Sequence, residues 1–226
     1  MLISSVFVSG PLYYAILHAG VGISLSLCYV GIVIGMFICG RVFDGEQFTQ
    51  DKLIASTFGI VGLVLVFSPS LKAVGWLALS AAFLSGLATA VNMATTKKIP
   101  YNGSQSAILV WGAGAVANIP LVFILGEPTP VFAWHIAWLY LLIFALASLV
   151  ASWTFIKGLK LIEAGSAGLL GLLEVVFGVL FGFVFFGERP SPIIFIGIAS
   201  ILAAAAIPYL KYFNAQTNRL DDKVSS

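Results

Sequence analysis

The chain has 226 residues, of which 60% are hydrophobic and 9% charged, with a formal net charge of +2 and a mean hydropathy of +1.07. Roughly a quarter of the residues in an average globular protein are charged, so this composition excludes a soluble domain. The apolar residues form continuous runs and do not alternate with polar ones, which excludes a transmembrane barrel and predicts an all-α, polytopic membrane protein.

Charged and turn residues divide the chain into about eight apolar segments that we expect to cross a bilayer as helices. The segments cover residues 1–18, 21–43, 53–70, 74–96, 105–126, 133–157, 164–187 and 192–213. The first segment is the weakest prediction, because it starts at Met1 and contains Pro11. The loops are short, and residues 214–226 form a polar tail that we expect to be disordered.

The positions of lysine and arginine predict the orientation of the helices. If the tail is cytoplasmic and eight spans alternate, only Lys72 and Arg189 face the other side. The remaining nine basic residues face the cytoplasm: Arg41, Lys52, Lys97, Lys98, Lys157, Lys160, Lys211, Arg219 and Lys223. We therefore expect a multi-pass protein of the cytoplasmic (plasma or cell inner) membrane with a cytoplasmic C-terminus.

Glu174 is the one acidic residue that lies well inside an apolar span, near the middle of residues 164–187. An unpaired charged carboxylate at that depth is energetically expensive, so such residues usually face a cavity or a partner. Three roles are open from the sequence. Glu174 could couple protons, being neutral when protonated and charged when exposed to water, it could bind a cationic substrate, or it could hydrogen-bond a neighbouring helix.

Part of the chain repeats itself with a shift of 142 residues and no gap. The matching pairs are Ser24 with Ser166, Gly40 with Gly182, Phe43 with Phe185, and Gly45-Glu46 with Gly187-Glu188. On the charge-based orientation Glu46 is cytoplasmic and Glu188 is outside, so the two copies are inverted, as in many secondary transporters. A carboxylate at a helix C-terminus opposes the helix dipole, so we expect Glu46 and Glu188, with their glycines, to act as structural fasteners of the turns.

The run LLEVVFGVLFGFVFFGE at 172–188, a Pro-containing turn and IGIASILAAAAI at 196–207 together resemble the last two helices of the EamA-type proteins of the drug/metabolite transporter superfamily. That pattern starts with Leu-Glu-Pro-Val, ends its first helix with Gly-Glu and has a glycine in its final helix. Glu174, Glu188 and Gly197 match it, whereas Val175 stands where proline is common.

The resemblance implies ten helices in an inverted 5+5 repeat, of which the first repeat is incomplete here. Residues 1–70 would be the last three helices of the first repeat, residues 74–213 the five helices of the second, and residues 214–226 the cytoplasmic tail. Two interpretations of the missing pair of helices are open. We favour an N-terminal fragment or misassigned start, and the alternative is a shortened family member.

Other residues inside the spans are candidates for contact with a substrate. Asn118 lies in a span rich in small residues and precedes Pro120, and three aromatic residues could stack on an organic molecule: Trp111, Trp153 and Tyr14. Interhelical hydrogen bonding for Asn118, and packing on lipid or core for the aromatic residues, are the competing interpretations.

The sequence contains no HExxH, GxSxG or Walker A motif, no paired intramembrane aspartates and no Cys/His metal spacing. We therefore expect no enzyme activity, cofactor, metal or nucleic-acid partner. The faces Gly31-xxx-Gly35 and Gly178-xxx-Gly182 carry small residues at one-turn spacing and predict close packing of helices. The expected partners are the lipid bilayer, a small-molecule substrate and a second copy in a homodimer, which these faces by themselves do not establish. The predicted function is a secondary transporter, by resemblance an exporter, of a small organic metabolite or drug. The alternative is a non-transporting membrane scaffold or an inactive transporter fragment.

Overall fold

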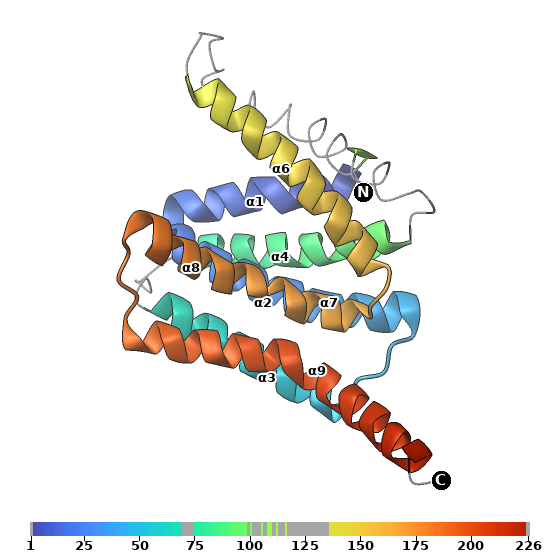
Figure 1. Cartoon of the computed structure of the whole chain (residues 1–226). Helices are drawn as coiled ribbons and strands as arrows, with labels where there is room; N and C mark the ends of the chain where they lie inside the picture. Colours follow the sequence, from blue (N-terminus) through green and yellow to red (C-terminus); the bar gives the residue numbers. More distant parts are fainter. Residues whose placement is uncertain are drawn as a thin grey trace.

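The computed structural model describes residues 2–68, 75–98, 100 and 136–224, together with five isolated positions between 105 and 116. All regular elements in this part of the chain are α-helices (Figure 1). They are α1 (Leu2–Ala19), α2 (Val21–Asp44), α3 (Gln50–Phe67), α4 (Trp76–Lys97), α6 (Ile136–Leu159), α7 (Ala164–Gly171), α8 (Leu173–Phe186) and α9 (Pro192–Val224).

Six spans of the described residues are long and apolar enough to cross a membrane, with α7 and α8 counted together as Ala164–Phe186. The protein is therefore a multi-pass helical membrane protein, as the composition predicts. The expected span at 105–126 lies outside the described residues except for isolated positions.

Two expectations about the extent of the helices are wrong. The apolar run at 164–187 is not one continuous helix, because it is interrupted at Leu172 between α7 and α8. The polar tail is not disordered as expected, since α9 continues through it as far as Val224.

The helices pack in antiparallel layers, and small residues let two pairs approach closely (Figure 1). Between α2 and α4, a Cβ atom on Gly86 would collide with the backbone carbonyl of Cys28, and one on Gly31 would lie 2.5 Å from the carbonyl oxygen of Phe83. The predicted close packing at Gly31 is confirmed. At Gly178 a Cβ atom would meet no described atom within 4 Å, so the prediction stays untested there.

The second close pair is α3 with α9, where a Cβ atom on Gly62 would lie 2.8 Å from the carbonyl oxygen of Gly197. The main hydrophobic core lies between this pair and the helices α2, α7 and α8. Its fully buried members include Val33, Leu63, Leu169 and Ile201. By contrast, only 6% of the residues in the apolar stretch of α6 are buried, so α6 lies at the margin of the described bundle.

The C-termini of α2 and α8 have the same local geometry. Gly45 (φ 67°, ψ 20°) and Gly187 (φ 64°, ψ 21°) both adopt the left-handed conformation that favours glycine at a helix end. The next residue then donates its backbone N–H back into the helix, from Glu46 to the Gly40 carbonyl at 3.0 Å and from Glu188 to the Gly182 carbonyl at 3.2 Å. Each turn therefore folds its glutamate side chain back towards its own helix.

Candidate functional site

The interruption between α7 and α8 places Glu174 in the first turn of a new helix. Around Leu172 the hydrogen bonds are of the tighter i→i−3 type, from the Leu172 N–H to Leu169 and from the Val175 N–H to Leu172, both at 3.1 Å. The Leu172 side chain is fully buried in the core, so the residue at which α7 ends is held by hydrophobic packing. A carboxylate in the first turn is favoured by the positive end of the helix dipole, a benefit that an unbroken helix would not give to Glu174.

Glu174 pairs with Tyr29 from α2. The Glu174 carboxylate lies close enough to the Tyr29 hydroxyl, and to the neighbouring Cys28 thiol, for its negative charge to act on both groups. Tyr29 is half-buried whereas Glu174 is exposed, so the carboxylate is accessible from one side while a polar partner holds it from the other. The two side chains come from segments about 145 residues apart, 29 and 174.

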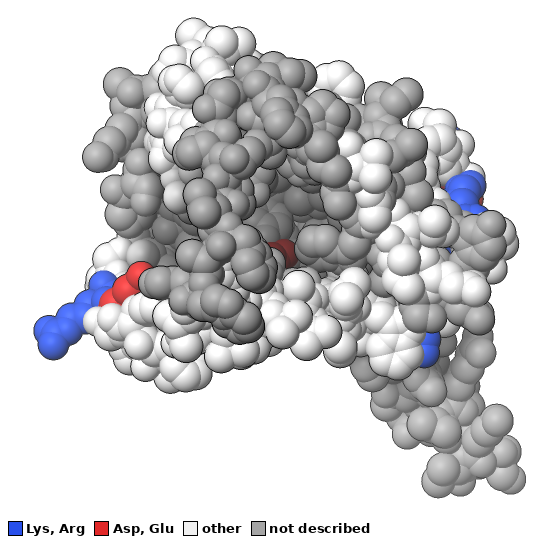
Figure 2. All heavy atoms as spheres, turned by 90° about the horizontal axis from the view of Figure 1, so that it is seen from above, with Lys and Arg blue, Asp and Glu red and all other residues white. Residues whose placement is uncertain are grey.

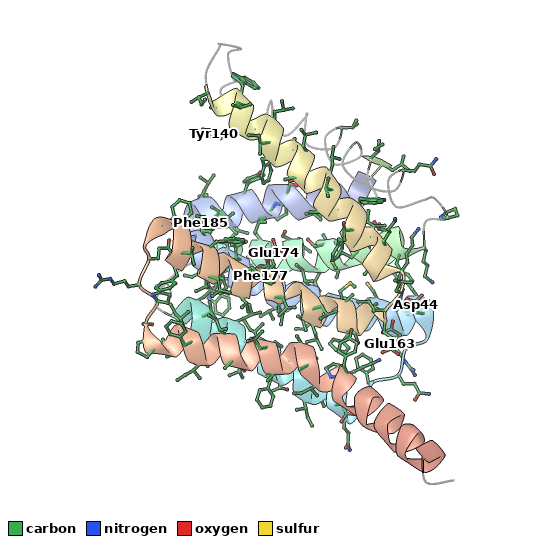
Figure 3. The ribbon with its side chains drawn as sticks, viewed as in Figure 1. Asp44, Tyr140, Glu163, Glu174, Phe177 and Phe185 are labelled. Carbon is green, nitrogen blue, oxygen red and sulfur yellow. The ribbon has the colours of Figure 1, made fainter. Side chains whose placement is uncertain are left out.

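The acidic side chain lies halfway along the bundle. Figure 3 shows Glu174 between α8 and the helices α1 and α4, far from the helix ends where Asp44 and Glu163 are labelled. In Figure 2 the same molecule is seen from above, and one acidic side chain is visible near the centre of this face. A carboxylate in this position can meet a solute or exchange a proton without leaving the interior of the bundle.

A buried polar contact lies next to the Glu174–Tyr29 pair. The Cys28 sulfur lies 3.9 Å from the Ser85 hydroxyl of α4, and that hydroxyl donates to the Val8 carbonyl of α1. Ser85 is fully buried, so these contacts tie α1, α2 and α4 together on the side of α2 that adjoins Tyr29. The partner of Glu174 is therefore held on a closely packed group of helices.

Of the other predicted substrate residues, the structure describes Trp153 and Tyr14, and each of these contacts a different neighbour. Trp153 is on α6, 40% exposed, with the Lys157 ammonium 4.0 Å from its ring centroid. Tyr14 is on α1 and stacks on His18 with ring centroids 4.1 Å apart. Trp111 and Asn118 lie outside the described residues.

Sequence reasoning missed Tyr29. The available signal was a hydroxyl in the middle of an otherwise apolar span, since a polar group at that depth needs a partner. Only the fold identifies which carboxylate supplies it.

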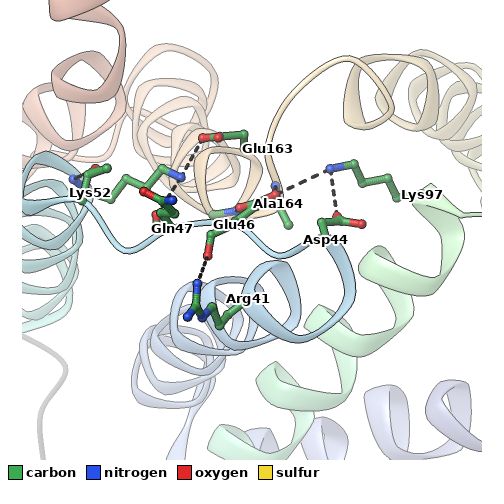
Figure 4. Close-up of polar contacts among 10 residues, drawn as sticks. Arg41, Asp44, Glu46, Gln47, Lys52, Lys97, Glu163 and Ala164 are labelled. Atoms are coloured by element: carbon green, nitrogen blue, oxygen red, sulfur yellow. Dashed lines mark hydrogen bonds and ion pairs between the residues drawn. The ribbon is translucent and has the colours of Figure 1, made fainter.

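A second polar group, which we call the Glu46 cluster, ties four helices together at one end of the bundle (Figure 4). At its centre the Glu46 carboxylate accepts hydrogen bonds from the backbone N–H groups of Ala164, at 2.5 Å, and Gly165, at 3.2 Å. These are the first two residues of α7, so Glu46 caps a helix 118 residues further along the chain. The Glu46 side chain is only 10% exposed, which makes the contact strong.

Ion pairs complete the Glu46 cluster. The Lys97 ammonium at the end of α4 lies 3.2 Å from Asp44 and 3.7 Å from Glu46. The Lys98 ammonium lies 3.1 Å from Asp44. At the start of α3 the Lys52 ammonium lies 2.7 Å from Glu163, the residue that precedes α7. The cluster thus comprises Asp44, Glu46, Lys52, Lys97, Lys98 and Glu163.

The opposite end of the bundle has no such cluster among the described residues. The Glu188 side chain is exposed, and in this part of the chain no hydrogen bond or ion pair reaches its carboxylate. Here α2 begins after Gly20, where no side chain caps it. The same Gly-Glu turn therefore has a capping role at one end and none at the other in this conformation.

Among the described residues no group of three or more His, Cys, Asp or Glu side chains is arranged to hold a metal ion. The chemistry that the Glu174 region offers is proton exchange, hydrogen bonding and attraction of positive charge.

The model of one protein family, the EamA-like transporter family, matches residues 74–210, which is more than half of the chain. A solved structure described only as "Crystal structure of protein" has a similar fold, with a TM-score of 0.68 at 18% identity. The similarity covers 92% of this chain and 77% of that one, and it extends to the fold alone. Comparison with curated proteins found no match. On the family match, this chain belongs to the EamA-like transporter family of the drug/metabolite transporter superfamily.

Proposed function

We propose that the protein is a secondary transporter that exports a small organic solute by alternating access, with Glu174 as the group that couples protons or binds the solute. The observation that carries the proposal is the exposed Glu174 carboxylate, which lies near Tyr29 at a helix interruption in the middle of the bundle. Interrupted helices with polar groups at their half-helix ends are typical of transporter binding sites. A non-transporting scaffold is not favoured, because the matching family is one of transporters.

The proposed inverted repeat would provide for alternating access, and two observations support it. The 142-residue shift superposes α2 (21–44) on 163–186, the span of α7 and α8, and α3 (50–67) on 192–209, the apolar part of α9. Across the contact of α3 with α9, the Ser200 hydroxyl donates to the Phe58 carbonyl at 2.7 Å, and these two positions are equivalent under the shift. Equivalent positions meet in this way beside a two-fold axis, which would relate an inward-open to an outward-open state.

We propose that the Glu46 cluster lies at the cytoplasmic face. The argument is the excess of lysine and arginine that the sequence assigns to that side, including Lys52, Lys97 and Lys98 of the cluster. The protein would then lie in the cytoplasmic membrane with its C-terminus inside. Protease access to a C-terminal tag in inverted and right-side-out vesicles tests this orientation.

The transport proposal is tested in proteoliposomes that contain the pH-sensitive dye pyranine. Panels of amino acids, organic cations and neutral aromatic drugs are added, and a solute that shifts the internal pH only with the protein present identifies a substrate. Glu174→Gln is then compared with Glu163→Gln, which makes the same chemical change at a helix end. We expect at least a tenfold loss of solute-driven proton flux in Glu174→Gln and less than a twofold change in the control.

Exchange of labelled solute without a pH gradient separates the roles of Glu174. If Glu174 couples protons, Glu174→Gln keeps solute exchange and loses proton flux. If Glu174 binds a cationic solute, both are lost. Full proton flux and full exchange in Glu174→Gln would eliminate both roles and leave a structural one, visible as a lower melting temperature.

A further inference from the structure

The two Gly-Glu turns have the same backbone shape but different partners. The residues that Glu46 contacts have equivalents at the Glu188 end of the bundle under the 142-residue shift. Glu46 accepts hydrogen bonds from the N–H groups of Ala164 and Gly165 at the start of α7. Under the 142-residue shift, Glu46 corresponds to Glu188, and Ala164 and Gly165 correspond to Gly22 and Ile23 at the start of α2. We infer that Glu188 is a second, alternating helix cap, which accepts from Gly22 and Ile23 when the bundle adopts the opposite conformation. The inference rests on the proposed alternating access.

The Glu188 turn is already formed in the shape that capping requires. Gly187 has the same left-handed conformation as Gly45, and the Glu188 N–H returns to the Gly182 carbonyl as that of Glu46 returns to Gly40. In both turns a Cβ atom on the helix glycine would strike the glutamate carboxylate, so both carboxylates lie over a glycine. The turns differ in their partners: besides α7, Glu46 has the Lys97 ammonium 3.7 Å from its carboxylate, and Arg41 donates to its carbonyl at 3.4 Å.

Among the described residues, no side chain caps the start of α2 in the way that Glu46 caps the start of α7. The residue before α2 is Gly20, with no side chain to accept from the first turn, and Val21 is 57% exposed. The first N–H groups of a helix have no partners inside it, so an uncapped start offers free donors to which an oxygen atom can bind. A carboxylate is favoured there over a neutral acceptor by the helix dipole.

The packing of α2 on α7 allows one cap to replace the other. The two helices touch closely near the Glu46 end, where Cβ atoms on Gly165 and Gly168 would meet Phe37 and Met36. The equivalent of Met36 on α8 is Gly178, where a Cβ atom would meet no described atom within 4 Å. Among the described residues, contact near one end without contact near the other permits a rocking motion that brings α2 to Glu188 while it takes α7 away from Glu46.

A cavity beside α2 gives its N-terminal half room for this motion. The cavity has a volume of about 230 Å³ and is lined by Ile23, Ser26, Leu63 and Phe67, among others. Under the shift, Ile23 and Ser26 are the equivalents of Gly165 and Gly168, and they border this free space between α2, α3 and α4.

The test uses pairs of spin labels that report each end without any substrate or pH gradient. One pair replaces Gln47 and Leu161 at the Glu46 end, and its equivalent under the shift replaces Ala19 and Arg189 at the other end, in a Cys28→Ser, Cys39→Ala background in nanodiscs. Distances are measured by double electron–electron resonance. Glu46→Gln should lengthen the 47–161 distance and shorten the 19–189 distance, changing the ratio of the two populations by about tenfold, because charge-assisted hydrogen bonds are lost.

Addition of Glu188→Gln to Glu46→Gln gives the deciding comparison. If Glu188 is the alternating cap, the double variant returns towards the wild-type distances by a similar factor. The matched control, Glu163→Gln, should change the ratio by less than about twofold. Identical distances in the single Glu46→Gln and double variants, or no response to Glu46→Gln at all, would overturn the inference.

The outcome is separable from that of the proposed function. If the distances respond as expected but no solute moves in proteoliposomes, the alternating caps stand and the transport proposal fails. If solute moves but Glu188→Gln leaves the distances of the Glu46→Gln protein unchanged, transport stands and the caps fail.

Discussion

The two ends of the bundle have the same turn and opposite surroundings. At one end Glu46 caps α7 inside a cluster of ion pairs that joins α2, α3, α4 and α7. At the other end Glu188 follows the same left-handed glycine, yet its carboxylate is exposed and no described side chain or N–H group pairs with it. The comparison teaches that a local sequence motif sets the shape of a turn, whereas the position of a distant helix decides whether that turn stabilises anything.

The largest expected difference between the ends is the effect of removing the carboxylate. Glu46→Ala leaves the N–H groups of Ala164 and Gly165 without their acceptor in a setting where Glu46 is 10% exposed. We expect a loss of about 2 kcal/mol in the free energy of unfolding, the scale of hydrogen bonds to a charged group. Glu188→Ala should change it by less than about 0.5 kcal/mol, as for most surface substitutions.

These values can be measured by unfolding with sodium dodecyl sulfate in mixed micelles, followed by circular dichroism. Equal losses for the two alanine variants would mean that Glu188 has a structural partner in this conformation, and the contrast between the ends would disappear.

The glycines beneath the two carboxylates provide a second, smaller contrast. A methyl group on Gly40 or on Gly182 would strike the glutamate of its own turn. Glu46 is held by α7 and cannot move aside, so Gly40→Ala should cost about 1–2 kcal/mol, as overpacking usually does. Glu188 is free to swing outwards, so Gly182→Ala should be nearly neutral.

Melting temperatures of the two alanine variants in detergent test this contrast. Two double variants, Gly40→Ala with Glu46→Ala and Gly182→Ala with Glu188→Ala, test whether the methyl group clashes with the glutamate. Removing the glutamate side chain should abolish the loss of stability that the methyl group adds. A Gly182→Ala variant less stable than Gly40→Ala would reverse the assignment of the rigid and the free turn.

The ion pairs of the Glu46 cluster should have the smallest effects. The Lys97 side chain is 17% exposed and lies near both Asp44 and Glu46, so Lys97→Met should cost about 1 kcal/mol or less. The Lys98 side chain is 48% exposed, and Lys98→Met should cost less than Lys97→Met.

Salt concentration provides the check on these two variants. Raising NaCl from 0.05 to 0.5 M should reduce the loss of stability in Lys98→Met more than that in Lys97→Met, because exposed ion pairs are screened more than half-buried ones. A Lys97→Met protein as stable as wild type at both salt concentrations would remove Lys97 from the structural account of this end.

Much of the fold was predictable from continuous apolar runs. The predicted spans 21–43 and 74–96 correspond to α2 (Val21–Asp44) and α4 (Trp76–Lys97). The boundaries fail where polar residues join a helix. The helix α3 starts at Gln50 and not at 53, because the Thr49 side chain caps it and lets Gln50, Asp51 and Lys52 form its first turn.

The candidate site was only half predictable. Glu174 stands out in the sequence because a charge inside an apolar run is expensive. The helix interruption two residues before it was not predictable, since no proline marks it and Leu172 is an ordinary helix-forming residue. Tyr29 was not predictable either, because its partner is on another helix.

The sequence by itself determined that this protein crosses a membrane many times, that Glu174 lies within a span, and that Gly45 and Gly187 end their helices. These features depend on local hydrophobicity and on backbone conformations that only glycine adopts without strain. The tertiary structure decided that Tyr29 faces Glu174, that α7 and α8 separate at Leu172, and that Glu46 but not Glu188 caps a helix. Such contacts join residues more than a hundred positions apart, so they follow from how rigid helices pack and not from any short stretch of sequence.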